Sequence, residues 1–331
     1  VGLSVCMLIV IYLIHEHSYD RHFKEHEQVF LLGTVMKHAG DESKSPATPY
    51  YIGSIMQEEF PEIAVQTKLL SLFTEDKTLM RYKPAAGAPQ TFYEPKGYFA
   101  DSSFFKIFSY EFTEGTAATA LLLPGSIVLS EEIAKKIFGN ESALNKRITI
   151  ASNLTGGDAE FNVTGVYKTS VKPSHIDARF FLSFKGSAMD EYVQSQGKNL
   201  VNNNMFFTYL KIKPGTNADL LTAKFPAFLE KHSGNELRAA GLTKVQFLTR
   251  LDNLHLKSGM EATVTPSGNL SYLYILGSVA LFVLLIACIN FMNLSTSRSS
   301  KRAAEVGVRK VLGAEKSSLI KQFLGESVLT A

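Results

Sequence analysis

The sequence predicts an α+β domain held between two transmembrane α-helices. An uncharged apolar segment stands near each end of the chain, and strand-like and helix-like patterns mix between them without strict β-α-β alternation. The composition of the 331 residues, 45% hydrophobic and 20% charged, is that of a folded protein. A net charge of +3 is too small to indicate a nucleic-acid partner.

The first apolar segment covers residues 1–14 and contains no charge. As a helix it would be about 20 Å long, short of the roughly 30 Å hydrocarbon core of a bilayer. Neither a basic n-region nor a small-residue cleavage site accompanies it, so it does not read as a signal peptide. We interpret residues 1–14 as part of a first transmembrane helix whose inner end is missing, in a truncated fragment. A buried core helix is the alternative.

The second apolar segment is the stronger signal. No Asp, Glu, Lys, Arg or His occurs from 262 to 297, and the apolar run of residues 271–295 is long enough for a second transmembrane helix. Tyr272 and Tyr274 suit the interfacial belt. The only cysteines, Cys6 and Cys288, lie in the two apolar segments. The domain between them therefore depends on its core and not on a disulfide.

Orientation follows from the charges that flank the apolar segments. Behind the second one, basic residues outnumber acidic ones between Arg298 and Lys321, whereas the flank after the first is acidic. The positive-inside bias then places residues 296–318 in the cytoplasm and residues 15–270 outside it. Membrane topology, with lipid headgroups as the only partner, is enough to explain such a basic flank. Residues 319–331 turn apolar again and read as the start of a third membrane helix.

Strands are predicted in the outer domain where β-branched and aromatic residues gather: Gln28–Met36, Ala64–Leu72, Thr91–Phe99, Phe161–Tyr167 and Met205–Lys213. In the last of these, Leu210 and Ile212 alternate with Tyr209 and Lys211, which is the period of a half-buried strand. Gly156-Gly157 fits a hairpin turn.

Two helices are predicted from their caps and apolar stripes. Ser130 caps the first, which carries Ile133 and Ile137 on one face and ends at Gly139. The second covers Asn217–His232, where Pro226 must kink or divide it. Asp41–Pro49 and Lys83–Gln90 read as loops.

A metal site is suggested by one short pattern. His22, Glu25 and His26 fit H-x-x-E-H, and on a helix the two histidines would share a face and bind zinc, with Glu25 as the base. The pattern has two free positions and the sequence places no third ligand. A solvated face beside the membrane explains it better, so we predict no metal site.

Catalytic motifs are otherwise missing from the sequence. It contains neither the G-x-x-x-x-G-K-[ST] run of a P-loop nor the G-x-S-x-G run of a serine hydrolase. We therefore predict no enzyme activity, no catalytic residue and no cofactor, and any ATP hydrolysis would fall to another subunit.

At its second apolar segment the chain resembles the FtsX-like permease domain of MacB-type ABC transporters. The matching residues are Leu285–Leu294, Arg302–Ala314 and Gln322–Ser327. Further stretches resemble the MacB-type periplasmic core: Ile127–Ser130 through Lys136–Gly139, and Val163–Tyr167 with Ser174-His175. Ser18-Tyr19-Asp20-Arg21 is also typical of these permeases.

The resemblance implies the first half of an inner-membrane, multi-pass permease subunit. Its periplasmic domain would consist of a porter-like part with an inserted second part. It implies as partners an ATP-binding cassette ATPase, a second permease subunit or half, and in the periplasm a further protein. ATP-driven motion would pass through the membrane helices to the periplasmic domain, for efflux, export or the handling of lipoproteins or peptides.

The same resemblance implies a coupling segment that docks on the ATPase. In this sequence its residues would be Glu305, Gly307, Arg309, Lys310 and Gly313. Val306, Val308 and Val311 give the stretch an apolar surface, and Gly313 can end a short helix lying on the membrane. A plain basic anchor is the simpler explanation of the same residues.

A two-span sensor is the competing function. It would bind a ligand outside and signal inside through a long heptad-patterned helix behind the second span. The break expected at Gly313 and the apolar residues that follow argue against that helix.

Overall fold

The computed structural model describes residues 2–38, 40–74, 76–196, 198–260, 263–313, 315, 317–318, 320–322 and 325, with the backbone alone for 295, 298–306 and 309–310. The chain divides into two compact units. One comprises Val1–Ile14 and Ser271–Ala331, and the other comprises His15–Leu270. We call them the helical unit and the outer domain.

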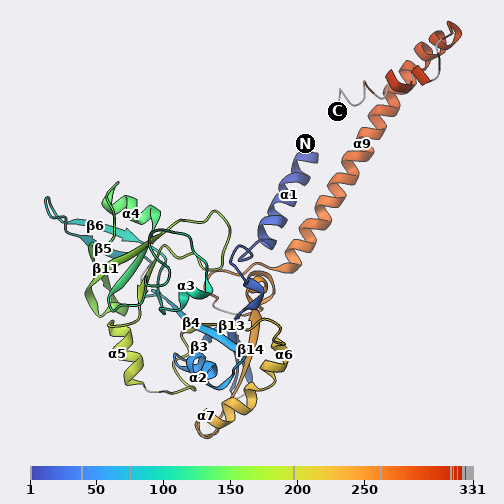
Figure 1. The fold of residues 1–331 in the computed structure, drawn as a ribbon. Helices are drawn as coiled ribbons and strands as arrows, with labels where there is room; N and C mark the ends of the chain where they lie inside the picture. The colour runs from blue at the N-terminus through green and yellow to red at the C-terminus, as the bar shows by residue number, and fades with distance from the viewer. Residues whose placement is uncertain are drawn as a thin grey trace. The chain divides into compact units, whose positions relative to one another are not determined.

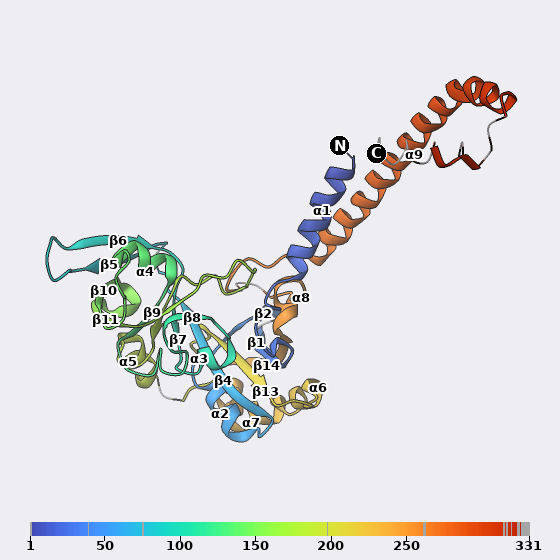
Figure 2. The same ribbon diagram turned by 45° about the horizontal axis from the view of Figure 1, so that its top comes forward.

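The helical unit contains two helices, α1 (Gly2–His17) and α9 (Leu270–Val311), which run side by side (Figures 1 and 2). They approach closely at Gly2, where an added Cβ would lie 2.9 Å from the Ala287 Cβ. Apolar side chains such as Phe282, Ile286 and Phe291 are exposed along α9. Such a surface is stable in lipid and not in water.

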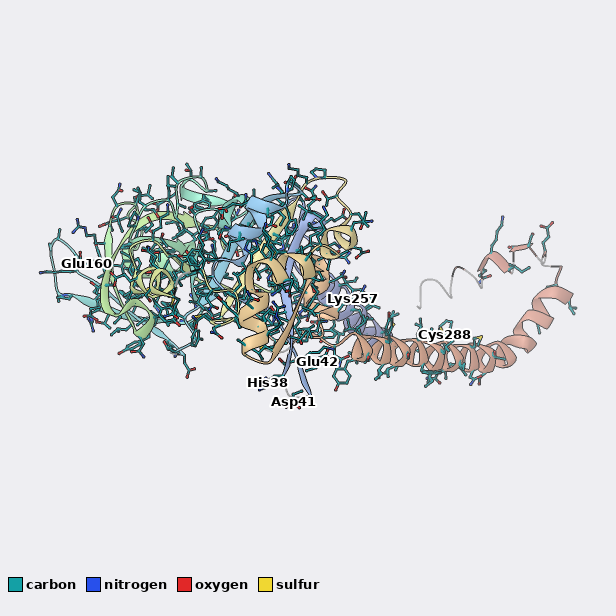
Figure 3. The ribbon with its side chains drawn as sticks, turned by 90° about the horizontal axis from the view of Figure 1, so that it is seen from below. His38, Asp41, Glu42, Glu160, Lys257 and Cys288 are labelled. Carbon is teal, nitrogen blue, oxygen red and sulfur yellow. The ribbon has the colours of Figure 1, made fainter. Side chains whose placement is uncertain are left out.

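Among the described residues, one helical segment, Leu270–Leu294, is long and apolar enough to cross a bilayer, and α1 is shorter. Cys288 lies on this segment with its side chain exposed (Figure 3). The helix does not stop at the end of the apolar run. It continues to Val311, 42 residues in all and about 60 Å long. The helical backbone therefore continues into the coupling segment that we expected after the second span, with a bend beyond Cys288 (Figure 3).

One half of the outer domain is a four-stranded antiparallel sheet in the order β14-β1-β13-β4. Strands β1 and β4 are parallel with β13 between them, and α2 connects them. Strands β13 and β14 are also parallel to each other, with β1 between them, and helices α6 and α7 connect β13 to β14. The elements are β1 (Val29–His38), α2 (Ile52–Glu59), β4 (Ile63–Ser71), β13 (Phe206–Ile212), α6 (Ala218–Thr222), α7 (Phe225–Ala239) and β14 (Leu242–Arg250).

The other half is inserted between β4 and β13 and extends the same sheet in the order β7-β12-β9-β11-β10-β5-β6 (Figure 1). Its elements are β5 (Thr78–Tyr82), β6 (Gln90–Glu94), β7 (Gly97–Ala100), α3 (Phe104–Ile107), β8 (Phe112–Gly115), β9 (Ser126–Ser130), α4 (Glu131–Phe138), β10 (Arg147–Ser152), β11 (Gly157–Tyr167), β12 (Phe180–Ser183) and α5 (Ala188–Ser195). A domain with an inserted second part is the architecture that the family resemblance implied.

The sheet is buried on both faces. Leu210 and Ile212 of β13 join a core beneath α2 and α7, whereas Phe207 and Tyr209 join a second core with Phe104 and Phe108. The alternation on β13 is therefore as predicted, but the strand is not half-buried, because Tyr209 is fully enclosed.

Most of the predicted elements are present. Ser130 caps α4 through its hydroxyl, and Gly139 ends that helix with φ of +66°. Gly156 and Gly157 turn the β10–β11 hairpin with positive φ. The chain divides before Pro226, which stands in the first turn of α7.

Two predictions about this domain were wrong. Asp41–Pro49 is not a loop, since it contains β2 (Asp41–Ser45) and β3 (Ala47–Thr48), which pair with β1 and β13. His38, Asp41 and Glu42 lie together at the β1–β2 turn (Figure 3). Thr91–Phe99 is not one strand, because Lys96 takes a left-handed φ of +62° between β6 and β7.

Candidate coupling site at the base of the outer domain

The segment after α1 turns sharply into the outer domain. The Ser18 amide and hydroxyl both donate to the His15 carbonyl, at 3.1 and 2.8 Å, where the helix ends at His17. Asp20 follows with φ of +61°, a left-handed conformation that aspartate tolerates better than most residues. Its side chain is fully buried. The Ser18–Arg21 motif therefore ends one element and anchors the next.

Asp20 is held by the loop that contains Ser174 and His175. The Asp20 amide donates to the Pro173 carbonyl at 3.1 Å. Its carboxylate accepts the Ser174 hydroxyl at 2.6 Å and the His175 amide at 3.1 Å, and His175 Nδ1 lies 2.8 Å from Oδ2. Burial disfavours the charged carboxylate, but the attraction of His175 and these hydrogen bonds outweigh it. The pKa of Asp20 is therefore lowered.

His175 connects Asp20 to the sheet. Its Nε2 lies 2.7 Å from the hydroxyl of Tyr209 in β13. With a proton on Nδ1 facing the carboxylate, Nε2 is left to form the hydrogen bond with the tyrosine hydroxyl. Burial raises the pKa of Tyr209 well above its usual value, so this hydroxyl keeps its proton. Asp20, His175 and Tyr209 form a buried chain from the end of α1 to a central strand.

The segment before α9 reaches the same histidine. The Thr265 hydroxyl donates to the His175 carbonyl at 3.1 Å, five residues before α9 begins at Leu270. The Thr263 hydroxyl in turn donates to the Thr265 carbonyl at 2.6 Å. The two ends of the outer domain thus converge on His175, one through its ring and amide and the other through its carbonyl.

A second pair of a histidine and a carboxylate, His255 and Glu16, lies at the end of α1. His255 belongs to α8 (Leu254–Lys257), and its Nε2 lies 2.8 Å from Glu16 Oε2 of α1. The Tyr19 ring stacks on the His255 ring at 3.6 Å between centroids. A Cβ on Gly268 would lie 2.9 Å from His255 Nε2 and 3.0 Å from Glu16 Oε2. The chain entering α9 therefore packs directly against this pair.

Of the five predicted coupling residues, Glu305, Gly307, Arg309 and Lys310 lie along the last turns of the α9 backbone. The side chains of Glu305, Arg309 and Lys310 are outside the described part of the structure. No atom in the described part of the chain lies within 4 Å of a Cβ added to Gly307, and Gly313 takes a φ of +89° just beyond the helix end at Val311. Their role in ATPase docking stays a prediction.

The H-x-x-E-H residues do not form a metal site. His22 and Glu25 lie on turns and His26 begins a short 3₁₀ helix (His26–Gln28), so no α-helix brings the two histidines onto one face. Glu25 adopts φ of +55° and pairs with Lys211. His26 Nδ1 faces the Phe23 carbonyl at 3.2 Å. In the described ranges, no three histidine, cysteine or carboxylate side chains gather as a metal would require.

Sequence reasoning identified part of this site and missed the rest. Asp20, Ser174 and His175 were included only as parts of family-like motifs. Tyr209, His255 and Thr265 were missed as site residues because their partners are remote in sequence. The one local indication of this site in the sequence was the charged Glu16, close behind an uncharged apolar segment.

Residues 1–228 match the family model of the MacB-like periplasmic core domain, and residues 277–331 match that of the FtsX-like permease C-terminal domain. The chain belongs to the MacB-like permease family. The match to the periplasmic core covers most of the outer domain described above, and the FtsX-like match covers the permease segment that follows, in a membrane protein of the ABC transporter permease group.

Named relatives agree with this assignment. The chain is 24% identical over 238 residues to the uncharacterized ABC transporter permease YvrN of Bacillus subtilis, covering 71% of this chain and 54% of YvrN. It is 31% identical over 124 residues to the macrolide export ATP-binding/permease protein MacB of Mannheimia succiniciproducens, covering 36% of this chain and 18% of that protein. The chain thus spans about half the length of YvrN.

A solved structure shows the same fold. It is a domain of a putative permease protein from Porphyromonas gingivalis, with a TM-score of 0.56 at 20% identity, covering 70% of this chain and 92% of that domain. At this identity the similarity concerns the fold alone.

Proposed function

We propose that this MacB-like chain is the N-terminal half of a permease subunit whose periplasmic domain is moved by ATP hydrolysis on a separate ATPase. The subunit would sit in the inner membrane as a multi-pass protein, with residues 15–270 in the periplasm, and work with a second permease subunit or half. Its cargo class would be a drug, peptide or lipoprotein. Family membership supports the permease assignment.

The observation that carries the proposal is the convergence of both domain ends on His175. A domain joined to helices by flexible linkers would not follow their movement. Here Asp20 lies three residues beyond α1 and Thr265 five residues before α9, and both bond to the same residue. A shift of either helix end would therefore displace the loop at His175 and, through Tyr209, the central strand.

The length of α9 supports the cytoplasmic half of the same proposal. The helix continues for 17 residues beyond the apolar segment that ends at Leu294. The helix thus joins the apolar segment to the coupling residues without an intervening loop. Glu305, Gly307, Arg309 and Lys310 at its end, with Gly313 as the stop, would receive the motion from the ATPase.

The test uses the full-length permease that contains this chain, purified with its ATPase. Glu305→Lys and Arg309→Glu are expected to abolish the dependence of ATP turnover on the permease while membrane insertion is retained. Lys301→Glu is the matched control, since it changes a charge on the same basic flank outside the coupling residues. Normal coupling in both variants would overturn the residue assignment, and the absence of any associated ATPase would overturn the function.

A further inference from the structure

A cavity of about 640 Å³ opens beside the end of α1. Its walls come from His15, Tyr19 and His22 on the segment behind α1, from the loop of residues 169–179, and from rings such as Tyr110 and Tyr167. The coupling contacts described above leave this cavity unused. We call it the base cavity.

The base cavity lies at the membrane surface if α1 is inserted, as the proposed function requires. His15 lines it and directly follows Ile14, the last residue of the uncharged apolar run. The Pro173 carbonyl on its other wall is bonded to the Asp20 amide, three residues past α1 and hence within about 10 Å of its end. The headgroup layer is about 5–8 Å thick on each side of the hydrocarbon core. The wall of the cavity formed by His15 is therefore at headgroup depth if α1 is inserted.

The charge of the base cavity favours an anion. Three basic side chains line it against two carboxylates, a net charge of +1 with histidines neutral: Lys96, Lys172 and Arg179 against Glu132 and Asp177. Lys96 is committed to Asp177 at 2.6 Å, and Arg179 to Glu132 at 3.2 Å. Within the described ranges, Lys172 has no carboxylate at ion-pair distance.

His22 adds a second polar group that lacks a partner. It lines the same cavity, and its Nδ1 is buried without a hydrogen bond to any described residue. Buried ring nitrogens are normally bonded, so an orphan beside a cavity is a group that a ligand would satisfy. His22 and Lys172 both line the cavity, so an anionic ligand in it has one polar and one cationic group within the same lining.

The loop tip beside Lys172 is apolar. Val171 is 100% exposed, between Ser170 and Lys172. A lone exposed valine is ordinary on a water-facing surface. Next to a lysine on the wall of the base cavity, however, it matches the pairing of an apolar and a basic contact by which proteins hold anionic lipid surfaces.

We propose that the base cavity binds the phosphate headgroup of an anionic phospholipid of the surrounding membrane, with Lys172 and His22 at the phosphate and Val171 at the glycerol and acyl region. A lipid bound there would contact Pro173 and Ser174, the residues that hold Asp20. It would thus be a resident ligand of the coupling site and not a transported substrate.

The test places the whole 331-residue chain in nanodiscs of phosphatidylcholine with a minor fraction of phosphatidylglycerol. A photo-cross-linking residue at position 171 is expected to form lipid adducts, with phosphatidylglycerol over-represented, at about tenfold the yield of the same residue at position 86. Ala86 is exposed in the β5–β6 loop, at the far end of the outer domain (Figure 2).

The contribution of the Lys172 charge to lipid binding is tested by mass spectrometry of the lipid that co-purifies with the chain. Lys172→Glu should retain about fivefold less phosphatidylglycerol than the unmodified chain, and Lys83→Glu, in the β5–β6 loop, should retain the normal amount. Equal labelling at positions 171 and 86, or equal lipid retention in the two lysine variants, would overturn the lipid site. Binding of inorganic phosphate that depends on Lys172, in a chain whose phosphatidylglycerol retention does not depend on Lys172, would show a free-phosphate site and would overturn it too.

Failure of this inference is separable from failure of the proposed function. Resistance of the chain to alkaline carbonate extraction shows whether α1 and α9 are inserted. A chain that is extracted refutes the membrane placement on which the lipid site rests. A chain that resists extraction but shows no enrichment at position 171 refutes the lipid site alone.

Discussion

The Asp20 carboxylate and the His175 imidazole lie 2.8 Å apart in the buried base of the outer domain, although 155 residues separate them in sequence. Asp20 stands three residues behind α1, and the His175 carbonyl is bonded to Thr265 in front of α9. This one contact therefore joins the two ends of the outer domain to each other and to its central sheet.

Asp20→Asn is expected to lower the free energy of unfolding by about 3 kcal/mol, because it leaves His175 buried without its charged partner. The measurement is denaturant unfolding of the detergent-solubilised chain. Asp41→Asn on the exposed strand β2 is the control and should change stability by less than about 0.5 kcal/mol. Equal effects of the two substitutions would show that the buried pair contributes nothing.

The lowered pKa of Asp20 predicts a loss of stability in acid. A carboxyl whose pKa is lower when folded stabilises the protein above its unfolded value of 3.8. That contribution is lost as the pH falls below 3.8 and through the folded pKa. Stability measured from pH 5 to pH 2 should therefore fall more steeply in the parent chain than in Asp20→Asn. Parallel curves would contradict the assignment.

Gly268→Ala should disturb the second pair, because its Cβ would press on both His255 and Glu16. Overpacking of this kind costs about 1–3 kcal/mol. Gly307→Ala, where nothing lies within 4 Å, is the matched control and should leave the outer domain unchanged. The readout is the thermal unfolding midpoint, and a neutral Gly268→Ala would mean that the segment before α9 can move away.

Lys244 on β14 makes the stability of the outer domain depend on pH in the alkaline range. Its ammonium is buried and donates to the Leu200 carbonyl at 2.8 Å and to Asn204 at 2.7 Å, and burial lowers the pKa of Lys244 to about 8. Between pH 8 and 10.5 the unfolded chain holds the proton more strongly, so stability should rise with pH by about 2–3 kcal/mol.

Lys244→Met should remove this rise, and Lys83→Met in the exposed loop should keep it. The measurement is the free energy of unfolding at several pH values from 7 to 11. A rise that survives in Lys244→Met would assign the alkaline dependence to another group.

Local chemistry made much of the fold predictable. Helix α4 was predicted from Ser130, its apolar face and Gly139, because caps act within a few residues. Strand β2 could not be predicted in this way, since its polar sequence carries no strand signal and it is held by pairing with β1. The candidate site is less predictable still. The contacts of His175 with Asp20, Tyr209 and Thr265 exist only once the domain has folded.

The central claim is that motion reaches the outer domain through the contacts at Asp20 and His175. The most direct measurement is the ATP-dependent fluorescence change of a dye on Ala86→Cys, in the reconstituted full-length permease with its ATPase and with Cys6 and Cys288 replaced by serine. We predict a change that Asp20→Asn abolishes while ATP hydrolysis continues, whereas Asp41→Asn preserves it. An undiminished fluorescence change in Asp20→Asn would contradict the claim.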